Sequence, residues 1–374
     1  MTGLRLGLIG ALPPYRGGIA HFSLRTWQTL VDRGHEVRPV TFSRQYPGFL
    51  FPGSTQFETE ATPVPSPVHR WIDSIGPVSW VRTGRRLRDL EALVFNHWMP
   101  FFGPAYGTIA RTAGRPTIGV VHNAIPHERR PGDRALGRWF LNRCDGCVVL
   151  SEEVERDLRI LGVTAPIRRI HHPIYDHFGD PVDRREARSR LGLDPDRPLI
   201  LFFGYVRAYK GLDVLIDALA RVREDMPALQ LVVAGEFYED EQLTRDRIVR
   251  LGLESRVRIR AGYVPDTDVA LLFSACDAVV QPYRTATQSG VAQIAYHFGR
   301  AMVLSDVGGL AEIVPHGEAG LVVPPADPHA LAEALRKLYE NDRYLALEEG
   351  ARARRHLFAW ERLAESIESL VANA

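Results

Sequence analysis

Short apolar runs alternate with longer amphipathic segments along this chain, and this alternation constrains the fold more than any other feature. Residues 4–11 are mostly apolar, residues 19–34 carry apolar side chains at helical spacing, and residues 36–42 are again mostly apolar. A strand, a helix and a strand in this order predict a parallel sheet covered by helices. The pattern predicts further strands at residues 92–97, 116–123 and 146–151.

The same alternation begins again at residue 198. A strand is expected at 198–206 and a helix at 211–225, followed by strands at 229–236, 256–264, 278–283 and 301–306 and a helix at 268–276. Two successive series predict two Rossmann-like α/β domains, and a length of 374 residues suits two domains. We place these domains at residues 1–175 and 176–355, with a last helix at 356–374. Residues 173–195 are rich in Pro, Asp and Arg, which indicates a linker.

Composition favours a globular protein without a membrane span. Apolar residues make up 45% of the chain and charged residues 24%, and no run of about 18 apolar residues occurs. The start of the chain is typical of a first strand rather than a signal peptide, so we expect a cytoplasmic protein. The net charge of +1 gives no reason to expect nucleic acid as a partner. Cys144 and Cys147 lie beside an expected strand and Cys276 stands alone, which indicates buried thiols.

A loop rich in glycine and proline joins the first expected strand to the first helix. Gly17 and Gly18 allow the backbone to approach a ligand, and the helix start offers free N–H groups to an anion. The loop therefore predicts either a phosphate-facing turn or an ordinary turn between a strand and a helix. It lacks the GxGxxG pattern, which argues against a dinucleotide-dependent dehydrogenase.

Two cations follow the first strand of the second domain, in "GYVRAYKGLDVL". Arg207 and Lys210 lie in a loop at the carboxyl end of that strand, between Gly204 and Gly211, where open α/β sheets bind ligands. Only one other lysine, Lys337, occurs in a chain that otherwise uses arginine. We expect Arg207 and Lys210 to bind a diphosphate.

A second loop of the same domain, "RTATQSG", precedes the helix expected at 291–299. Thr287, Gln288, Ser289 and Gly290 lie just before or at the start of that helix, so their N–H groups would face a phosphate. A turn at Gly308 and Gly309 follows the next strand, with Glu312 just after it. We expect Glu312 near the same ligand.

Four segments of the chain resemble retaining glycosyltransferases of the GT-B fold, in the large family 4. These are "GGIAHFSLRTWQTLVDRGHEV", "GYVRAYKGLDVLIDAL", "LSDVGGLAEIVPHGEAGLVVPPADPHALAEAL" and "FAWERLAESI". The resemblance implies two Rossmann-like domains facing across a cleft, with a nucleotide-sugar donor bound by the second domain and an acceptor by the first. It also implies that the last helix crosses back to the first domain.

The chain departs from the family pattern at its two glutamates. Aligning Gly299 with the glycine that ends the family's helix places Ala286 and Ile294 at those positions. Tyr205 occupies the position where the family has an arginine, and Arg207 follows two residues later. In a retaining transfer without a covalent protein nucleophile, the main demand is stabilisation of the departing diphosphate, and cations and N–H dipoles meet it. We therefore expect an active enzyme with an altered donor pocket, in which Gln288, Ser289 and Glu312 take over part of the recognition.

Histidines supply candidates in the first domain. His122 follows a strand at the place where the family has a histidine near the reacting sugar, His97 follows another strand, and His21 lies on the first helix. Tyr263, in the strand expected at 256–264, is a further candidate in the second domain. No spaced cluster of metal ligands appears, so we expect neither a metal nor another cofactor. The DxD spacing at 266–268 predicts a helix N-cap rather than a metal site.

The leading hypothesis is a transferase that moves a hexosyl-type sugar from a nucleotide-diphosphate sugar to a glycan, a lipid-linked or a small-molecule acceptor. The alternatives are a sugar-nucleotide epimerase of the same fold and a non-catalytic nucleotide-sugar or glycan binder. Basic stretches such as "RTGRRLR" favour either solvated helix faces or peripheral contact with an anionic membrane. The loop "TFSRQYPGFLFPGSTQFE" is a candidate acceptor loop.

Overall fold

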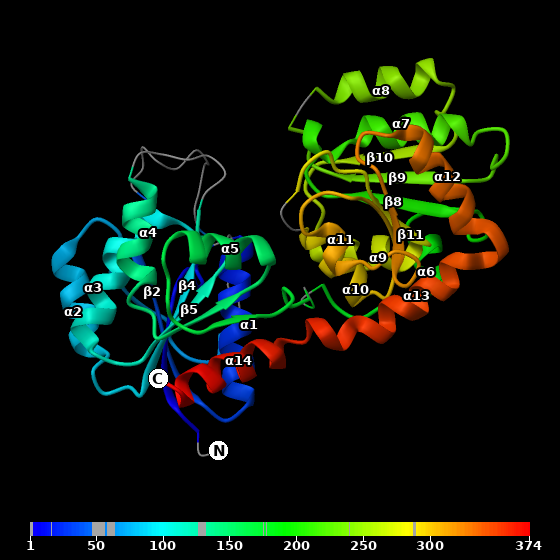
Figure 1. Ribbon diagram of the computed structural model, residues 1–374. Coiled ribbons are helices and arrows are strands. Elements are labelled where there is room, and N and C mark those ends of the chain that lie inside the picture. The colour runs from blue at the N-terminus through cyan, green and yellow to red at the C-terminus, as the bar shows by residue number, and fades with distance from the viewer. Residues whose placement is uncertain are drawn as a thin grey trace. The chain divides into compact units, whose positions relative to one another are not determined.

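The computed structural model describes residues 3–15, 17–46, 57, 64–125, 132–174, 176, 178–238, 240–286 and 289–374. The chain divides into two compact units (Figure 1). Unit 1 comprises Met1–His171 with Ala359–Ala374, and unit 2 comprises His172–Phe358. These boundaries lie within a few residues of the predicted ones.

Unit 1 is built on a parallel sheet. In the described residues this sheet has seven strands in the order β3-β2-β1-β4-β5-β6-β7. The strands are β1 Arg5–Ile9, β2 Glu36–Arg44, β3 His69–Asp73, β4 Ala92–His97, β5 Thr117–Val121, β6 Gly146–Val149 and β7 Ile167–Arg169. The helices are α1 Gly18–Asp32, α2 Pro77–Arg86, α3 Gly103–Ala113, α4 Asp133–Leu141, α5 Glu152–Ile160 and α14 Trp360–Ala372. Chain order reverses between β1 and β4, so the loops after these two strands leave toward opposite faces.

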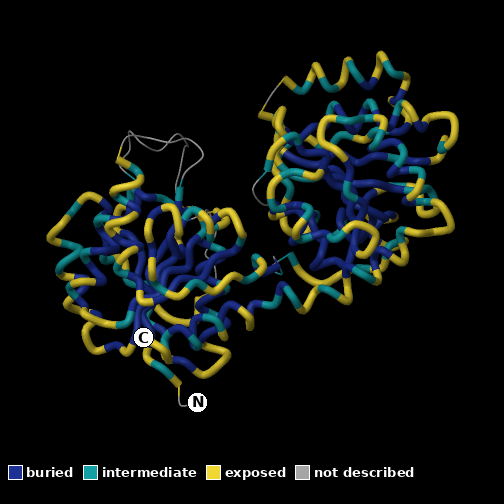
Figure 2. Tube along the Cα trace, in the orientation of Figure 1, coloured by how far each residue is buried: buried dark blue, intermediate teal, exposed yellow. Residues whose placement is uncertain are grey.

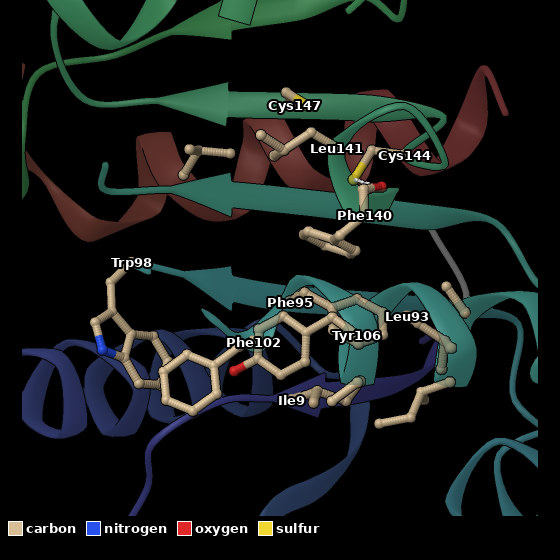
Figure 3. Packing of buried hydrophobic residues seen from close by; sticks show 14 of the residues in the cluster. Ile9, Leu93, Phe95, Trp98, Phe102, Tyr106, Phe140, Leu141, Cys144 and Cys147 are labelled. Carbon is tan, nitrogen blue, oxygen red and sulfur yellow. Dashed lines mark hydrogen bonds between the residues drawn. The ribbon is translucent and has the colours of Figure 1, made fainter. Parts of the chain in front are cut away.

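Apolar side chains cover both faces of this sheet. Phe95 of β4 packs with Phe102, Tyr106 and Phe140 on one face, where Figure 3 also shows Cys144 and Cys147. The three cysteines of the chain are buried and free, as the sequence indicated. On the other face, residues of α1 and α14 form a second core cluster.

The last helix, α14, belongs to unit 1. Trp360 at its start packs on Phe22 of α1, with 5.0 Å between ring centroids. Near its end, the buried Glu368 accepts hydrogen bonds from the Arg33 guanidinium at 2.6 and 2.8 Å, and it lies 2.9 Å from Nε2 of His35. Nδ1 of His35 accepts from the Leu4 N–H, which leaves Nε2 to donate to Glu368. The predicted return of this helix to the first domain is therefore confirmed.

Unit 2 is built on a second parallel sheet. Its described strands lie in the order β10-β9-β8-β11-β12-β13. The strands are β8 Leu199–Phe203, β9 Gln230–Gly235, β10 Val257–Ala261, β11 Ala278–Gln281, β12 Ala301–Ser305 and β13 Gly320–Val323. The helices are α6 Arg184–Arg190, α7 Leu212–Arg221, α8 Glu241–Arg250, α9 Asp266–Ala275, α10 Gly290–His297, α11 Leu310–Ile313, α12 Pro328–Tyr339 and α13 Arg343–Arg354. The two sheets confirm the predicted α/β architecture.

Alternate residues of the central strands face two separate cores in unit 2. Leu199 and Leu201 of β8 pack into one cluster with α9 and α10, whereas Ile200 and Phe202 pack into another with α7 and α12. The strands are accordingly buried and the outer faces of the helices exposed (Figure 2). Both faces of the sheet need this cover because a parallel sheet is apolar on both sides.

The predicted linker at 173–195 is wrong over its second half. Residues 184–190 form α6, whose N-cap Asp183 accepts a hydrogen bond from the Glu186 N–H. Ala187 is buried in unit 2, and the Arg188 guanidinium donates to the Ala275 carbonyl and to Asp277. Buried partners distant in the sequence thus turn an arginine-rich stretch into a packed helix.

Candidate functional site

The carboxyl ends of β8 and β11 lie side by side where strand order reverses in unit 2. Parallel pairing joins Ile200 to Ala278 and Leu201 to Val279. Open α/β sheets bind ligands outside the carboxyl ends of the strands at such a switch point. The loops that leave this point are 204–211, which holds the 3₁₀ turn η3 (Ala208–Lys210), and 282–289. They touch closely, because a Cβ on Gly211, whose φ is +67°, would lie 2.1 Å from the Pro282 carbonyl oxygen.

Lys210 ends the η3 turn and is buried, with 8% of the residue exposed. Its Nζ lies 5.5 Å from the centre of the Tyr283 ring. Burial, helped by the positive charge of Arg207, lowers the Lys210 pKa to about 8. In the described part of the chain no carboxylate forms an ion pair with Lys210. A buried ammonium without a counter-ion is well placed to bind an anionic ligand.

The start of α10 approaches the same ammonium. The position that a Cβ on Gly204 would occupy lies 3.0 Å from Nζ of Lys210 and 3.7 Å from Cγ2 of Val291, in the first turn of α10. Ser289 is the N-cap but its side chain does not cap the helix, and Gly290 after it is exposed. Among the described residues no side chain caps the N-terminus of α10, whose first N–H groups lie beside a cation, and this arrangement suits an anion. Thr287 and Gln288, two predicted members of this site, lie outside the described residues.

Ser289 has an internal partner that the sequence did not reveal. Its Oγ donates to Oε1 of Gln281 at 2.5 Å, and both residues are buried. Nε2 of Gln281 has no hydrogen-bond partner in the described structure. Gln281 is the last residue of β11, so an amide donor stands at the switch point. Strand-end position was the signal that could have identified it.

Arg207 precedes the η3 turn and is exposed. Its guanidinium carbon lies 4.4 Å from the centre of the Tyr238 ring, and the Tyr205 ring packs edge-on against Tyr238 at 5.0 Å. The structure therefore places Arg207 near Lys210, but stacked on an aromatic ring. Tyr205, which stands where the family has an arginine, contributes to that stacking.

The remaining candidates of unit 2 lie on other elements. Ile294 is buried in the apolar cluster that packs α10 on the sheet, and Ala286 packs at its margin. Glu312 is exposed on α11, and Tyr263 is 80% exposed after β10 at the far edge of the sheet. Within the described part of the chain, no hydrogen bond or ion pair joins Glu312 to the Lys210 turn.

The DxD residues have a different role from the predicted N-cap. Pro265 is the N-cap of α9, and Asp266 and Asp268 both lie in the first turn. Asp268 pairs with Arg260 at 3.6 Å. Their negative charge suits a helix start, so the structural interpretation stands while the capping role is corrected. The described residues hold no group of three or more His, Cys, Asp and Glu that could bind a metal ion.

In unit 1, the corresponding switch point lies between β1 and β4. Gly17 precedes α1 with φ +107°, and Gly18 begins that helix with its backbone exposed. His21 lies one turn into the helix and is partly exposed. His122, after β5, is partly exposed and packs edge-on against Phe22 with 4.5 Å between ring centroids. These residues gather at the carboxyl ends of the strands.

His97 does not join them. It is fully buried beside Phe140 and Tyr106, and burial lowers its pKa to about 3. A neutral imidazole enclosed by aromatic rings packs as part of the core, so the structure gives no support to the site role predicted for His97.

Two parallel Rossmann-like units, each with its own switch point, make up the GT-B fold. Family models match residues 16–177, described as Glycosyltransferase Family 4, and residues 197–341, described as Glycosyl transferases group 1. The chain belongs to this glycosyltransferase family. It is an enzyme of that class.

Curated relatives agree with this assignment, and solved structures share the fold. D-inositol 3-phosphate glycosyltransferase 1 of Catenulispora acidiphila is 32% identical over 76% of this chain and 72% of the relative. Alpha-D-kanosaminyltransferase of Streptomyces kanamyceticus is 26% identical over 75% and 78%. Anabaena HepE, solved with UDP, aligns over 100% of both chains with a TM-score of 0.75 and 19% identity. Sucrose-phosphate synthase of Thermosynechococcus elongatus aligns over 99% and 98% with a TM-score of 0.71 and 22% identity.

None of the helices in the described ranges is long and apolar enough to cross a membrane.

Proposed function

We propose that this enzyme transfers a sugar, with retention of anomeric configuration, from a nucleotide-diphosphate sugar held by unit 2 to a hydroxyl-bearing acceptor held by unit 1. The observation that carries the proposal is the buried ammonium of Lys210 beside the uncapped start of α10. Both groups act on an anion, and they meet at the point where the fold binds ligands.

The chemistry asks for charge stabilisation rather than for a protein nucleophile. When the bond between the sugar and the diphosphate breaks, negative charge grows on the departing phosphate oxygen. Lys210 and the N–H groups at the start of α10 face this charge without reorganising, which lowers the barrier. Arg207 on the same loop adds a second cation, and Nε2 of Gln281 supplies a neutral donor.

The relatives support this class of donor and acceptor. HepE was solved with UDP and, separately, with UDP-glucose, and the Catenulispora relative is named for D-inositol 3-phosphate. We propose a nucleoside-diphosphate sugar as donor and a polyhydroxylated small molecule or glycan as acceptor. In unit 1, the start of α1 at Gly17 and Gly18 and the imidazole of His122 would face that acceptor. Peripheral contact of basic surface with a membrane is not needed for this function.

The same site disfavours an epimerase. Such an enzyme needs a free acid or base at the reacting sugar, yet the family's glutamate positions hold Ala286 and Ile294. A carboxylate close to the Lys210 turn, Asp213, is engaged by Arg284. A nucleotide-sugar binder without turnover would release no nucleoside diphosphate, so a turnover assay separates it from an enzyme.

Turnover of a panel of nucleotide-diphosphate sugars, followed by release of the nucleoside diphosphate, tests the proposal. Lys210→Met should lower kcat by about a hundredfold or more, because one contact to the leaving group is lost. Lys337→Met is the matched control: it removes the one other lysine, which is exposed on α12, and should leave kcat unchanged. A folded Lys210→Met variant with full turnover would contradict the proposal, and proton NMR of the first product reports retention or inversion.

A further inference from the structure

An ion pair ties the two loops of the donor site together. The Arg284 guanidinium, in the loop after β11, donates to both carboxylate oxygens of Asp213 at 2.9 and 2.7 Å, and Asp213 lies in the first turn of α7. The same guanidinium donates to the Ala208 carbonyl at 2.6 Å, and the Arg284 backbone N–H donates to the Tyr209 carbonyl at 2.6 Å. Among the described residues, Arg284 therefore donates two hydrogen bonds to the η3 turn and two to the first turn of α7, which follows it.

These contacts bracket Lys210. Ala208 and Tyr209 are the two residues before it, and Asp213 follows it by three residues. Arg284 also adjoins Tyr283, whose ring lies 5.5 Å from the Lys210 ammonium. A shift of Arg284 would consequently move both the turn that carries the ammonium and the ring that covers it.

We propose that Arg284 and Asp213 form a positioning clamp, which sets Lys210 against the start of α10. The proposal rests on the proposed function of Lys210. Neither clamp residue touches the substrate in this proposal, so each acts through Lys210.

The exposure of the Arg284–Asp213 pair distinguishes a positioning role from a purely stabilising one. The side chains of Arg284 and Asp213 are 36% and 43% exposed, and exposed ion pairs contribute little to the free energy of unfolding. Loss of a clamp that positions Lys210 should therefore lower kcat far more than it lowers the free energy of unfolding. Misplacing a catalytic group by about 1 Å costs up to about a hundredfold in rate.

The protonation of Lys210 reports directly on the clamp. Arg207 of its own loop lies near Lys210, Tyr283 of the neighbouring loop lies against its ammonium, and the charged pair Arg284–Asp213 flanks its turn. Burial is the main cause that holds the Lys210 pKa at about 8, below its usual 10.5. An open clamp admits water to the ammonium, so the pKa of Lys210 should rise.

A protein labelled with ¹³Cε-lysine makes that pKa measurable, since the chain holds only Lys210 and Lys337. We would compare Arg284→Ala, Arg284→Lys, Asp213→Asn and the double variant in kcat, KM, thermal unfolding and lysine titration. Arg336→Ala is the control, because Arg336 also combines carboxylate partners, Asp225 and Glu333, with a carbonyl partner, that of Arg221.

Arg284→Ala and Asp213→Asn should each lower kcat by about tenfold or more with a smaller change in KM. The double variant should lose no more than either single one, Arg284→Lys should recover part of the rate, and the Lys210 titration should move to higher pH. Arg336→Ala should change none of these.

Wild-type kcat together with an unmoved Lys210 titration in Arg284→Ala would overturn the clamp. Equal effects of Arg284→Ala and Arg336→Ala on kcat and on the titration would overturn it as well. If the proposed function of Lys210 is wrong, Lys210→Met will keep its turnover, whatever effect the Arg284 variants have on the Lys210 titration. That outcome distinguishes a failure of the proposed function from a failure of the clamp.

Discussion

At the scale of single residues, Lys210 carries the chemical argument. Its ammonium is buried, has no described carboxylate partner and faces the start of α10. The protein bears the cost of burying this charge, which lowers its pKa to about 8. A bound diphosphate would compensate that cost, so the site stabilises its ligand and destabilises its own empty state.

The pH dependence of kcat/KM follows from this pKa. Lys210 is charged below about pH 8 and becomes neutral above it, so kcat/KM should be level below pH 8 and fall about tenfold per pH unit above it. Steady-state kinetics between pH 6 and 10 measure this limb. Lys210→Arg keeps its charge throughout, so its rate, although lower, should show no such limb. A wild-type profile that stays level to pH 10 would contradict the role of Lys210.

The local sequence indicated Lys210 as a candidate ligand-binding residue, but it did not indicate the residues that we propose position Lys210. A lysine in a glycine-bounded loop is visible in a chain that otherwise uses arginine. Arg284 and Asp213 lie 71 positions apart, and Gln281 looks like any strand residue, so their roles appear only when β8 and β11 pair. His97 shows the opposite case: its strand-end position looked functional, but aromatic neighbours from α3 and α4 enclose it.

At the scale of elements, the close contact between the η3 turn and the loop after β11 builds the site. Gly211 permits this contact, since its φ is +67° and a side chain there would meet the Pro282 carbonyl oxygen at 2.1 Å. Because that oxygen belongs to the backbone, a Cβ could be accommodated only by separating the two loops.

Gly211→Ala should therefore lower the free energy of unfolding by about 2–3 kcal/mol and reduce kcat by about tenfold or more. Gly252→Ala is a close control: its φ is +64°, yet the nearest atom to its Cβ would be Nη1 of Arg223 at 3.7 Å. It should show only the backbone strain, about 1 kcal/mol, with kcat unchanged. Denaturant unfolding and steady-state kinetics of both variants decide the matter, and equal kcat values would count against the contact.

Elements with a strong apolar pattern were predictable, and elements fixed by tertiary contacts were not. The core strands of both sheets and helices α1, α7 and α9 follow from runs of apolar residues. The prediction missed β3 and α2, which lie after a long polar stretch, and α8, in which only Ile248 is buried. It also left out helices α3, α4, α5, α12 and α13 and strands β7 and β13. It also assigned α6 to a linker, because the buried partners of Arg188 lie almost 90 residues away.

At the scale of the whole molecule, each unit has its own switch point, and α14 fastens the end of the chain to unit 1. This organisation suits an enzyme with two substrates, one held by each sheet. In unit 2, the positive charges and helix dipole needed for a diphosphate come from the chain itself.

We accordingly predict that activity does not require a divalent metal ion. Lys210, Arg207 and the start of α10 together supply the charge stabilisation that a metal would otherwise give. Turnover should be the same in EDTA and in manganese, and Asp268→Asn should change kcat less than it changes thermal unfolding. Activity lost in EDTA and restored by manganese would contradict this prediction.

The most direct test of the central claim is the ¹³Cε-lysine titration of the wild-type protein with and without a nucleoside diphosphate that binds by calorimetry. If the diphosphate sits on Lys210, the pKa of that lysine should rise from about 8 by one unit or more, because a nearby opposite charge favours the ammonium. Lys337 on α12 should titrate identically in both samples. A bound nucleoside diphosphate that leaves the Lys210 titration unmoved would contradict the account.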